Sequence, residues 1–315
     1  MQNWAHKDGN DRGFINFLSG FLSEKENESK IQFPDFSQSK KLFLFSDYSG
    51  DHSESKFLSY SILIIDEQSF RTFLSSHKVF WQEHNLENRI IDYKKLNDRI
   101  RSKALLPFLK FCNNLNGLIL TIVISKNIKS IFQEEKPKHI NKNLVLWRSG
   151  KVQEKILRIR EFILLSLIGL GKEAQDVQWI TDNDDIVANN GQLNALNKFM
   201  KEGLLKHLDY ELENFSIITL SNDSEEKTLE KLCSLPDLIA GTLVDFIGNH
   251  DLENKHLKEG EILTPIKHEK QKVNPITNWL SKNEDSHNLK KVNITITESN
   301  VQEGMIISLF RFPEF

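Results

Sequence analysis

The stretch Gly117-Leu-Ile-Leu-Thr-Ile-Val-Ile124 decides the fold class of this chain. It contains no charged residue, and it is rich in the β-branched side chains that favour strands. A continuous apolar run of this length is typical of a strand in the middle of a sheet, with both of its faces covered. We therefore predict a central strand here.

Strand and helix patterns alternate on either side of this central strand. Two upstream runs, residues 41–47 and 57–66, are rich in strand formers, and Gly50, Asp51 and several serines separate them, which predicts an antiparallel hairpin. Further strands are expected at residues 177–182 and 215–220. The alternation indicates an α/β fold whose mixed sheet is flanked by helices. The expected helices comprise residues 96–115 with Pro107 inside, 151–170, 192–208, and 225–247 with Pro236 inside.

The two ends of the chain differ in character from its middle. The first 40 residues hold an amphipathic segment and a polar stretch, and we expect a leader that packs loosely on the core. Residues 249–274 are polar and rich in Lys and Glu, as in a linker. A short helix at 275–280 and a hairpin of 292–297 with 305–312 are expected after it. The predicted organisation is a leader at residues 1–40, a main domain at 41–250, and a linker with a small C-terminal appendage at 251–315.

The composition is typical of a soluble globular protein. The chain is 39% hydrophobic with a formal net charge of -3, so nucleic acid could be bound only through a local basic patch. Cys112 and Cys233 lack the spacing of a zinc site or a disulfide framework, which indicates a reducing cytoplasm. The N-terminus lacks a signal-peptide pattern, and the apolar stretch 162–170 is half as long as a membrane span requires. We expect a cytoplasmic protein with no membrane segment.

Three aspartates stand where packing alone would not favour a charge. Asp47 ends the first apolar run, Asp182 ends the fourth expected strand with Asp184 close behind, and Asp237 lies in the helix at 225–247. An unpaired buried carboxylate costs several kcal/mol, so something must compensate it. If the first and fourth strands are neighbours, their ends bring Asp47 and Asp182 together, and the helix can add Asp237.

The helix around Asp237 has a feature that supports this grouping. Ala240 and Gly241 follow Asp237 by three and four residues, so the face that carries the acid is almost flat. We expect this face to lie close to the sheet. We interpret Pro236 as a break or restart of the helix, which is a local irregularity of the kind found at functional sites.

Converging carboxylates suit a two-metal site. Mg²⁺ prefers carboxylate oxygens and retained waters, and two ions ~3.5 to 4 Å apart stabilise both the attacking and the leaving oxygen in phosphodiester hydrolysis. The alternative is structural. In that interpretation Asp182 and Asp184 cap the next helix, and Asp47 fills a turn.

Other chemistries find less support in the sequence. Lys151, Lys155 and Arg158 fall on one helical face, which we interpret as solvated surface. The ten His residues show no metal-binding spacing. The chain has no Gly-x-Ser-x-Gly elbow, and its glycines fit neither a Walker loop nor a dinucleotide fingerprint, which argues against a nucleotide cofactor.

Three short motifs contain these aspartates: Phe45-Ser-Asp-Tyr-Ser-Gly-Asp51, Trp179-Ile-Thr-Asp-Asn-Asp-Asp-Ile-Val-Ala-Asn189 and Leu235-Pro-Asp-Leu-Ile-Ala-Gly241. Together they resemble the signature of the bacterial family called domain of unknown function 3800. The first resembles its Asp-x-Ser-Gly turn, the second its middle motif, and the third its closing helix. The motifs occur in the family's order, and the resemblance covers residues 41–250.

The resemblance implies a variant of the ribonuclease H fold and a metal-dependent nuclease, with Asp47, Asp182 and Asp237 as metal ligands. The family often has an acid-x-Lys element before its first long helix, and Asp92-Tyr-Lys94 is the matching stretch here. Asp is one methylene shorter than the Glu that is common there, so Asp184 competes with Asp92 for the place of a fourth ligand. Lys94, beside a proposed ligand, is a candidate to bind the scissile phosphate.

We therefore expect a nuclease that uses Mg²⁺ or Mn²⁺ to hydrolyse a nucleic acid. Its expected metal ligands are Asp47, Asp182, Asp184 and Asp237, and Asp92 and Lys94 complete the expected catalytic set. The alternative is a catalytically silent scaffold of the same fold that binds a partner protein or nucleic acid. A further hypothesis is that the C-terminal appendage docks a protein partner in a larger bacterial complex, with antiviral defence as one setting.

Overall fold

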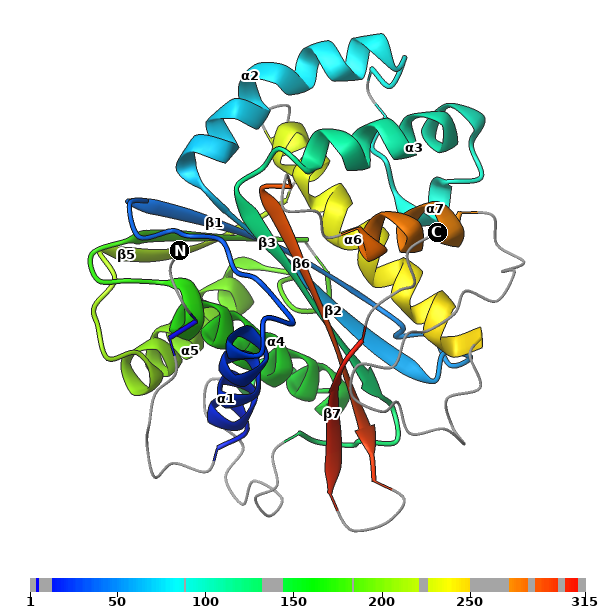
Figure 1. Ribbon diagram of the computed structural model, residues 1–315. Helices are drawn as coiled ribbons and strands as arrows, with labels where there is room; N and C mark the ends of the chain where they lie inside the picture. The colour runs from blue at the N-terminus through cyan, green and yellow to red at the C-terminus, as the bar shows by residue number, and fades with distance from the viewer. Residues whose placement is uncertain are drawn as a thin grey trace. The chain divides into compact units, whose positions relative to one another are not determined.

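Strands and helices alternate along the chain (Figure 1). The computed structural model describes residues 4–5, 13–87, 89–131, 144–182, 184–220, 226–249, 272–282, 287–299 and 304–310. Most of the linker predicted at 249–274 lies outside these residues. In chain order the elements are α1 (Phe14–Asn27), β1 (Lys41–Ser49), β2 (Phe57–Asp66), α2 (Glu67–Glu83), the 3₁₀ turn η1 (Tyr93–Lys95), α3 (Arg99–Cys112), β3 (Gly117–Ser125), α4 (Gly150–Leu170), β4 (Asp176–Thr181), α5 (Asn190–His207), β5 (Asn214–Thr219), α6 (Glu226–Asn249), α7 (Val273–Ser281), β6 (Leu289–Glu298) and β7 (Met305–Leu309).

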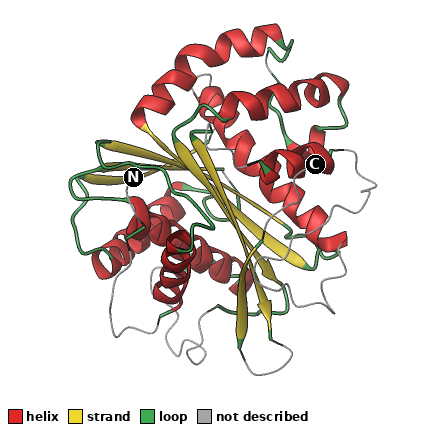
Figure 2. Cartoon of the chain, viewed as in Figure 1, coloured by secondary structure: helices red, strands yellow, loops and turns green. Residues whose placement is uncertain are grey.

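Seven strands of the described residues form one sheet in the order β5-β4-β1-β2-β3-β6-β7 (Figure 2). β3 pairs antiparallel with β2 and parallel with β6, and β6 pairs antiparallel with β7. The sheet is therefore mixed, and helices flank it. This confirms the predicted α/β class, and it places the two strands of the predicted C-terminal hairpin in the sheet beside β3.

β3 is the buried central strand that its sequence predicts. Every residue from Gly117 to Ile124 is buried, on both faces of the strand. In the antiparallel register Phe57 stands opposite Ser125 and Ile65 opposite Gly117. Close packing requires glycine at position 117, because a Cβ there would overlap the backbone oxygen of Ile64. Burial on both faces accounts for the absence of alternation between apolar and polar residues in this run.

The chain divides into two compact units. Unit 1 comprises Met1–Leu44 and Ser130–Ser221, and unit 2 comprises Phe45–Lys129 and Asn222–Phe315. In unit 1, β4 and β5 are parallel, α5 packs on β5, and α4 packs on both α1 and α5. In unit 2, α6 packs on β2, β3, η1 and α7, and α2 packs on β2.

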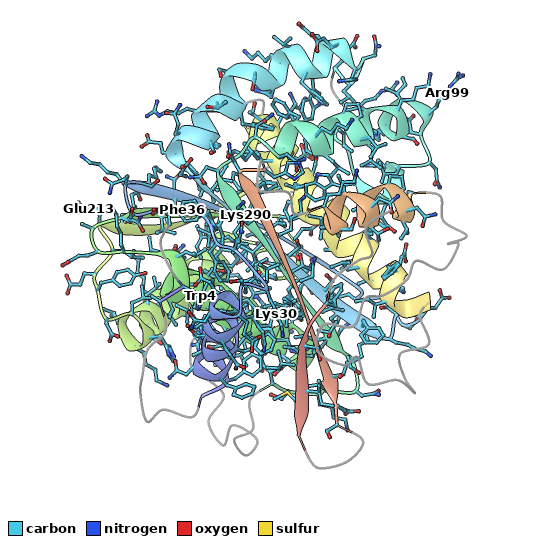
Figure 3. The ribbon with its side chains drawn as sticks, viewed as in Figure 1. Trp4, Lys30, Phe36, Arg99, Glu213 and Lys290 are labelled. Carbon is cyan, nitrogen blue, oxygen red and sulfur yellow. The ribbon has the colours of Figure 1, made fainter. Side chains whose placement is uncertain are left out.

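The described residues of the N-terminal segment, 4–5 and 13–40, pack tightly in unit 1, in contrast to the loose leader expected from the sequence. Trp4 is only 3% exposed, and its ring centre lies 4.5 Å from that of Phe33. Its Nε1–H donates to Ser19 Oγ of α1 at 3.0 Å, and Figure 3 labels Trp4 beside this helix. Gly169 of α4 leaves room for this ring, since a Cβ there would overlap the indole.

Two prolines lie inside continuous helices. α3 continues through Pro107 and α6 through Pro236. The interpretation of Pro236 as a break in the helix is therefore wrong. The apolar side chains around Leu235 and Leu238 are fully buried, so packing holds the helix together where one backbone hydrogen bond is lost. No helix in the described part of the chain is long and apolar enough to cross a membrane.

Candidate carboxylate site

Asp47 lies inside β1, two residues before the strand ends at Ser49. The expectation that it ends the strand is therefore wrong by two residues, and the turn begins at Gly50. Gly50 has a φ of 98°, and a Cβ at this position would overlap the backbone oxygen of Phe57. Only glycine suits this conformation. The Gly of the Asp-x-Ser-Gly motif thus has a local backbone role, separate from that of the acid.

The carboxyl group of Asp47 lies within hydrogen-bonding reach of that of Asp237, which lies on α6. Both residues belong to unit 2. Ionised carboxylates have acceptors only, so two carboxyl groups can share a hydrogen bond only while one of them holds a proton. Asp237 Oδ2 also accepts from the backbone N–H of Tyr93 at 2.7 Å, and Asp47 Oδ1 accepts from the N–H of Tyr48 at 2.7 Å.

The surroundings of Asp237 favour its neutral form. Burial raises the pKa of Asp237 above its usual value of 3.8, and the negative charge of Asp92 acts in the same direction. The Tyr93 N–H, the hydrogen bond with Asp47 and the positive charge of Lys94 act in the opposite direction. Burial is the largest of these effects. A carboxyl pair of this kind binds either a proton or a cation.

Tyr93 of η1 contacts α6 at several points and also contacts Lys272, just before α7. Its hydroxyl donates to Asp245 Oδ2 at 2.6 Å, and Asp245 lies on α6 eight residues after Asp237. The Tyr93 backbone N–H bonds to Asp237 and its hydroxyl to Asp245, and between these two bonds the ring lies on Gly241, where a Cβ would overlap the ring. Lys272 Nζ, just before α7, donates to the Tyr93 carbonyl at 2.8 Å and stands 3.7 Å from the ring centre. Burial, followed by the bond to Asp245, raises the pKa of the Tyr93 hydroxyl, which therefore stays neutral.

The flat face of α6 accommodates this tyrosine. α6 packs on β2 and β3 of the sheet, as expected, and Gly241 itself lies against Tyr93 of η1. Sequence reasoning also missed Tyr93, Asp245 and Lys272. A signal was available, because Asp237, Gly241 and Asp245 are spaced four residues apart and therefore share one helical face.

Asp92 and Lys94 flank Tyr93 and differ in exposure. The carboxylate of Asp92 caps η1, with Oδ1 accepting from the Lys94 N–H at 2.8 Å and Oδ2 paired with Lys95 Nζ at 3.0 Å. Lys94 is exposed. The charges of both Asp92 and Lys94 act on Asp237. The predicted acid-x-Lys element therefore lies near the Asp47–Asp237 pair.

The acids of the middle motif belong to unit 1. Asp182 follows β4 and is exposed. Asp184 Oδ2 lies 3.1 Å from Lys155 Nζ, which also lies 2.9 Å from Asp185 Oδ1, and Asp184 Oδ1 accepts from the N–H of Ile186 at 2.9 Å. Burial raises the pKa of Asp184, and the Lys155 charge opposes this effect.

Two interpretations of this region are wrong. Asn189 caps α5, with its side chain accepting from the Gln192 N–H, so neither Asp182 nor Asp184 is the cap. The predicted solvated face of α4 is largely buried. Lys151 is exposed as predicted, but Lys155 is 11% exposed in its ion pairs, and Arg158 is 3% exposed with its Nε 2.9 Å from Glu154 Oε1.

Unit 2 brings together four of the predicted site residues, Asp47, Asp92, Lys94 and Asp237. Two of them, Asp47 and Asp237, are in direct carboxyl contact. Within the described residues, no group of three or more His, Cys, Asp or Glu side chains is arranged to hold a metal ion. The site is a carboxyl pair with a third acid and a lysine within electrostatic reach.

Comparisons with family models, with curated proteins and with solved structures found no match to this chain. The features of this chain that bear on its function are therefore the site itself and the three sequence motifs.

Proposed function

We propose that this chain is a metal-dependent nuclease with a ribonuclease H-like fold, which hydrolyses phosphodiester bonds in nucleic acid. The observation that carries the proposal is the close approach of the Asp47 and Asp237 carboxyl groups, which bring β1 and α6 together in unit 2. The order of the three sequence motifs, with their resemblance to the family called domain of unknown function 3800, supports the same activity.

The carboxyl pair fits a hard divalent cation. Mg²⁺ retains several waters and is commonly held by one or two carboxylates together with substrate phosphates, so a third protein ligand is not required. A proton shared by Asp47 and Asp237 would occupy the oxygens that a cation would use, and a cation would displace it. Asp92 is less suited as a ligand, because its two oxygens already bind the Lys94 N–H and Lys95.

In this proposal different residues of unit 2 would bind the metal ion, orient a ligand and bind the substrate phosphate. Asp47 and Asp237 would hold Mg²⁺ or Mn²⁺, and the Tyr93 N–H orients the Asp237 carboxyl. When bound, the ion supplies positive charge that stabilises the phosphoryl oxygens and lowers the pKa of a bound water. The exposed ammonium of Lys94 would bind a phosphate of the substrate. Asp182 is proposed as a further metal ligand only because of its sequence motif.

A catalytically silent scaffold is the second candidate, and specific ion pairs favour it. Lys155 neutralises Asp184, and Lys95 neutralises Asp92, so two of the predicted acids already have a cation. On this evidence Asp184 is left out of the proposed ligand set. The scaffold and the nuclease differ in one measurable respect, which is whether the Asp47–Asp237 pair binds a divalent cation.

Replacing Asp47 by Asn tests the proposal. Labelled single- and double-stranded DNA and RNA would be incubated with the full chain in Mg²⁺, in Mn²⁺ and in EDTA. We expect cleavage that requires the divalent ion and that falls by about a hundredfold or more in Asp47→Asn, which corresponds to roughly 3 kcal/mol of transition-state stabilisation. Titration calorimetry with Mn²⁺ alone should show binding to the parent and none to the variant.

Glu83→Gln is the matched control. Glu83 is an exposed acid at the end of α2 in unit 2, so its replacement removes the same charge without touching the carboxyl pair. We expect this variant to cleave and to bind Mn²⁺ like the parent. Equal cleavage by Asp47→Asn and the parent would refute the site. Absence of both cleavage and Mn²⁺ binding in the parent would favour the scaffold.

A further inference from the structure

Three lysines gather where α2 meets α6 in unit 2. Lys231 Nζ of α6 stands 4.9 Å from the centre of the Trp81 ring of α2. Lys227 precedes Lys231 by four residues, and Lys78 precedes Trp81 by three, so each is one helical turn away on the same face. The two helices therefore present three ammonium groups around a single contact.

These charges are not neutralised by neighbouring acids. Within the part of the chain that the structure describes, none of the three ammonium groups forms an ion pair with a carboxylate. Glu230 precedes Lys231 directly and therefore points about 100° away around the helix. Lys78 and Lys227 are exposed, whereas Lys231 is half-buried against the indole.

The lysines also repel one another. Burial lowers the pKa of Lys231, and the positive charges of Lys78 and Lys227 lower it further. Burial and the charge of Lys231 likewise lower the pKa of His77, which is only 3% exposed. An anion bound at this place would relieve the repulsion.

We propose that Lys78, Lys227 and Lys231 form a binding surface for the phosphate backbone of a nucleic acid. This proposal rests on the proposed function, because the surface would hold the strand that the carboxyl pair cleaves. Lys231 precedes Asp237 on the same helix by six residues, which is about 9 Å along the axis. Six residues also turn the helix by about 600°, so the two side chains project about 120° apart, and a strand bound to the lysines would have to pass around α6 to bring a further phosphate to Asp47 and Asp237.

The chemistry of the surface predicts that it does not distinguish one base from another. Trp81 is 2% exposed, and Lys231 stands over its ring, so no base can stack there. Point charges on flexible stems contact phosphates without distinguishing bases. The surface should therefore bind in a sequence-independent and strongly salt-dependent manner.

Binding without cleavage tests the surface. Fluorescence anisotropy of a labelled single-stranded oligonucleotide would be measured in EDTA across a range of salt concentrations, for the parent and for the triple variant Lys78→Gln, Lys227→Gln and Lys231→Gln. We expect the triple variant to bind roughly tenfold or more weakly, and the slope of log affinity against log salt to fall by about 2. The double variant Lys78→Gln with Lys227→Gln leaves the Trp81 contact intact, and its slope should fall by about 1.4.

A second triple variant provides the control. Lys198, Lys201 and Lys206 are exposed lysines of α5, and replacing all three by Gln makes the same change in net charge. This control should keep the parent's salt slope. The proposal is overturned if both triple variants lose affinity equally, if neither the double nor the triple variant loses affinity, or if the parent binds no oligonucleotide.

Two further outcomes separate the possibilities. Vesicles of phosphatidylserine and phosphatidylcholine offer a different phosphate source, and lysine-dependent binding to these vesicles without binding to the oligonucleotide would overturn the proposal. Lysine-dependent binding of the oligonucleotide by a parent chain that never cleaves it would support the surface and reject the nuclease. Cleavage that depends on Asp47 but not on the lysines would support the nuclease and reject the lysine surface.

Discussion

The two acidic clusters of this chain compensate their charges in different ways. In unit 1 the carboxylates of Asp184 and Asp185 share Lys155, whose ammonium lies within 3.1 Å of both. In unit 2 the carboxyl of Asp237 lies against that of Asp47 and accepts a hydrogen bond from the backbone N–H of Tyr93. Burial raises the pKa of both Asp184 and Asp237.

The difference shows which cluster can exchange its counter-charge. The ammonium of Lys155 is covalently part of the chain, so a dissolved metal ion does not readily replace it. The raised pKa of Asp237 favours a proton on the unit 2 pair, and a metal ion or a higher pH would compete with that proton for the oxygens. Burial alone does not identify a reactive acid. The partner that compensates the acid does.

The largest expected effect is on cleavage, and it separates the two clusters directly. Asp237→Asn removes a proposed ligand and should lower divalent-dependent cleavage by about a hundredfold or more. Asp184→Asn should lower it by less than about tenfold, because Lys155 retains Asp185 as its partner. Both variants would be assayed with the oligonucleotide substrates in Mg²⁺ and Mn²⁺.

Matched unfolding curves serve as the control for this pair of variants. Both substitutions are nearly isosteric, so both proteins should fold as the parent does. If Asp184→Asn loses as much activity as Asp237→Asn while remaining folded, the ion pair with Lys155 does not keep Asp184 out of the site, and the comparison fails.

A smaller effect is expected from the glycines of α6. Gly241→Ala places a methyl group inside the volume of the Tyr93 ring, which Lys272 and Asp245 hold from other sides. We expect the free energy of unfolding to fall by about 1–3 kcal/mol, with a parallel loss of cleavage as η1 shifts. Chemical denaturation and the cleavage assay would measure the two effects.

Gly248→Ala on the same helix is its internal control. Gly248 is exposed, and a Cβ there would meet no atom within 4 Å. Alanine favours a helix over glycine by up to about 1 kcal/mol, so this variant should be slightly more stable than the parent. Equal stability of the two alanine variants would show that the Tyr93 contact is not tight.

Much of the fold was predictable because its signals are local. The limits of β2 and β3 follow from apolar runs that end at Asp66 and after Ile124, and Asp66 also caps α2 by accepting from the Ser69 N–H. Helix limits were less accurate. α3 begins at Arg99, where Asp98 caps it, and not at Leu96. Propensity alone does not identify a cap.

The site was predictable only in part, because its contacts join distant segments. The sequence indicated that Asp47 and Asp237 belong together, and it singled out Asp92 and Lys94 near them. It could not show that Lys155 pairs with Asp184 or that Tyr93 lies on Gly241, since each pair is formed by elements far apart in the chain. Such pairings depend on how helices pack, and residue spacing within one helix reports only which side chains share a face.

The smallest expected effect is on the pH dependence of stability. A raised pKa means that folded Asp237 keeps its proton at pH values where the unfolded chain has lost it, so unfolding releases a proton. Between the usual value of 3.8 and the raised pKa, the free energy of unfolding therefore falls as pH rises, by up to about 1.4 kcal/mol per pH unit. Asp237→Asn has no carboxyl proton to release, so its free energy of unfolding should not show this decline with pH.

Urea unfolding of both proteins in EDTA, from pH 4 to pH 8, would give the difference in stability. A difference that stays constant with pH would mean that Asp237 is ionised in the folded chain and that the carboxyl pair holds no exchangeable proton, which would make it resemble the Asp184 cluster.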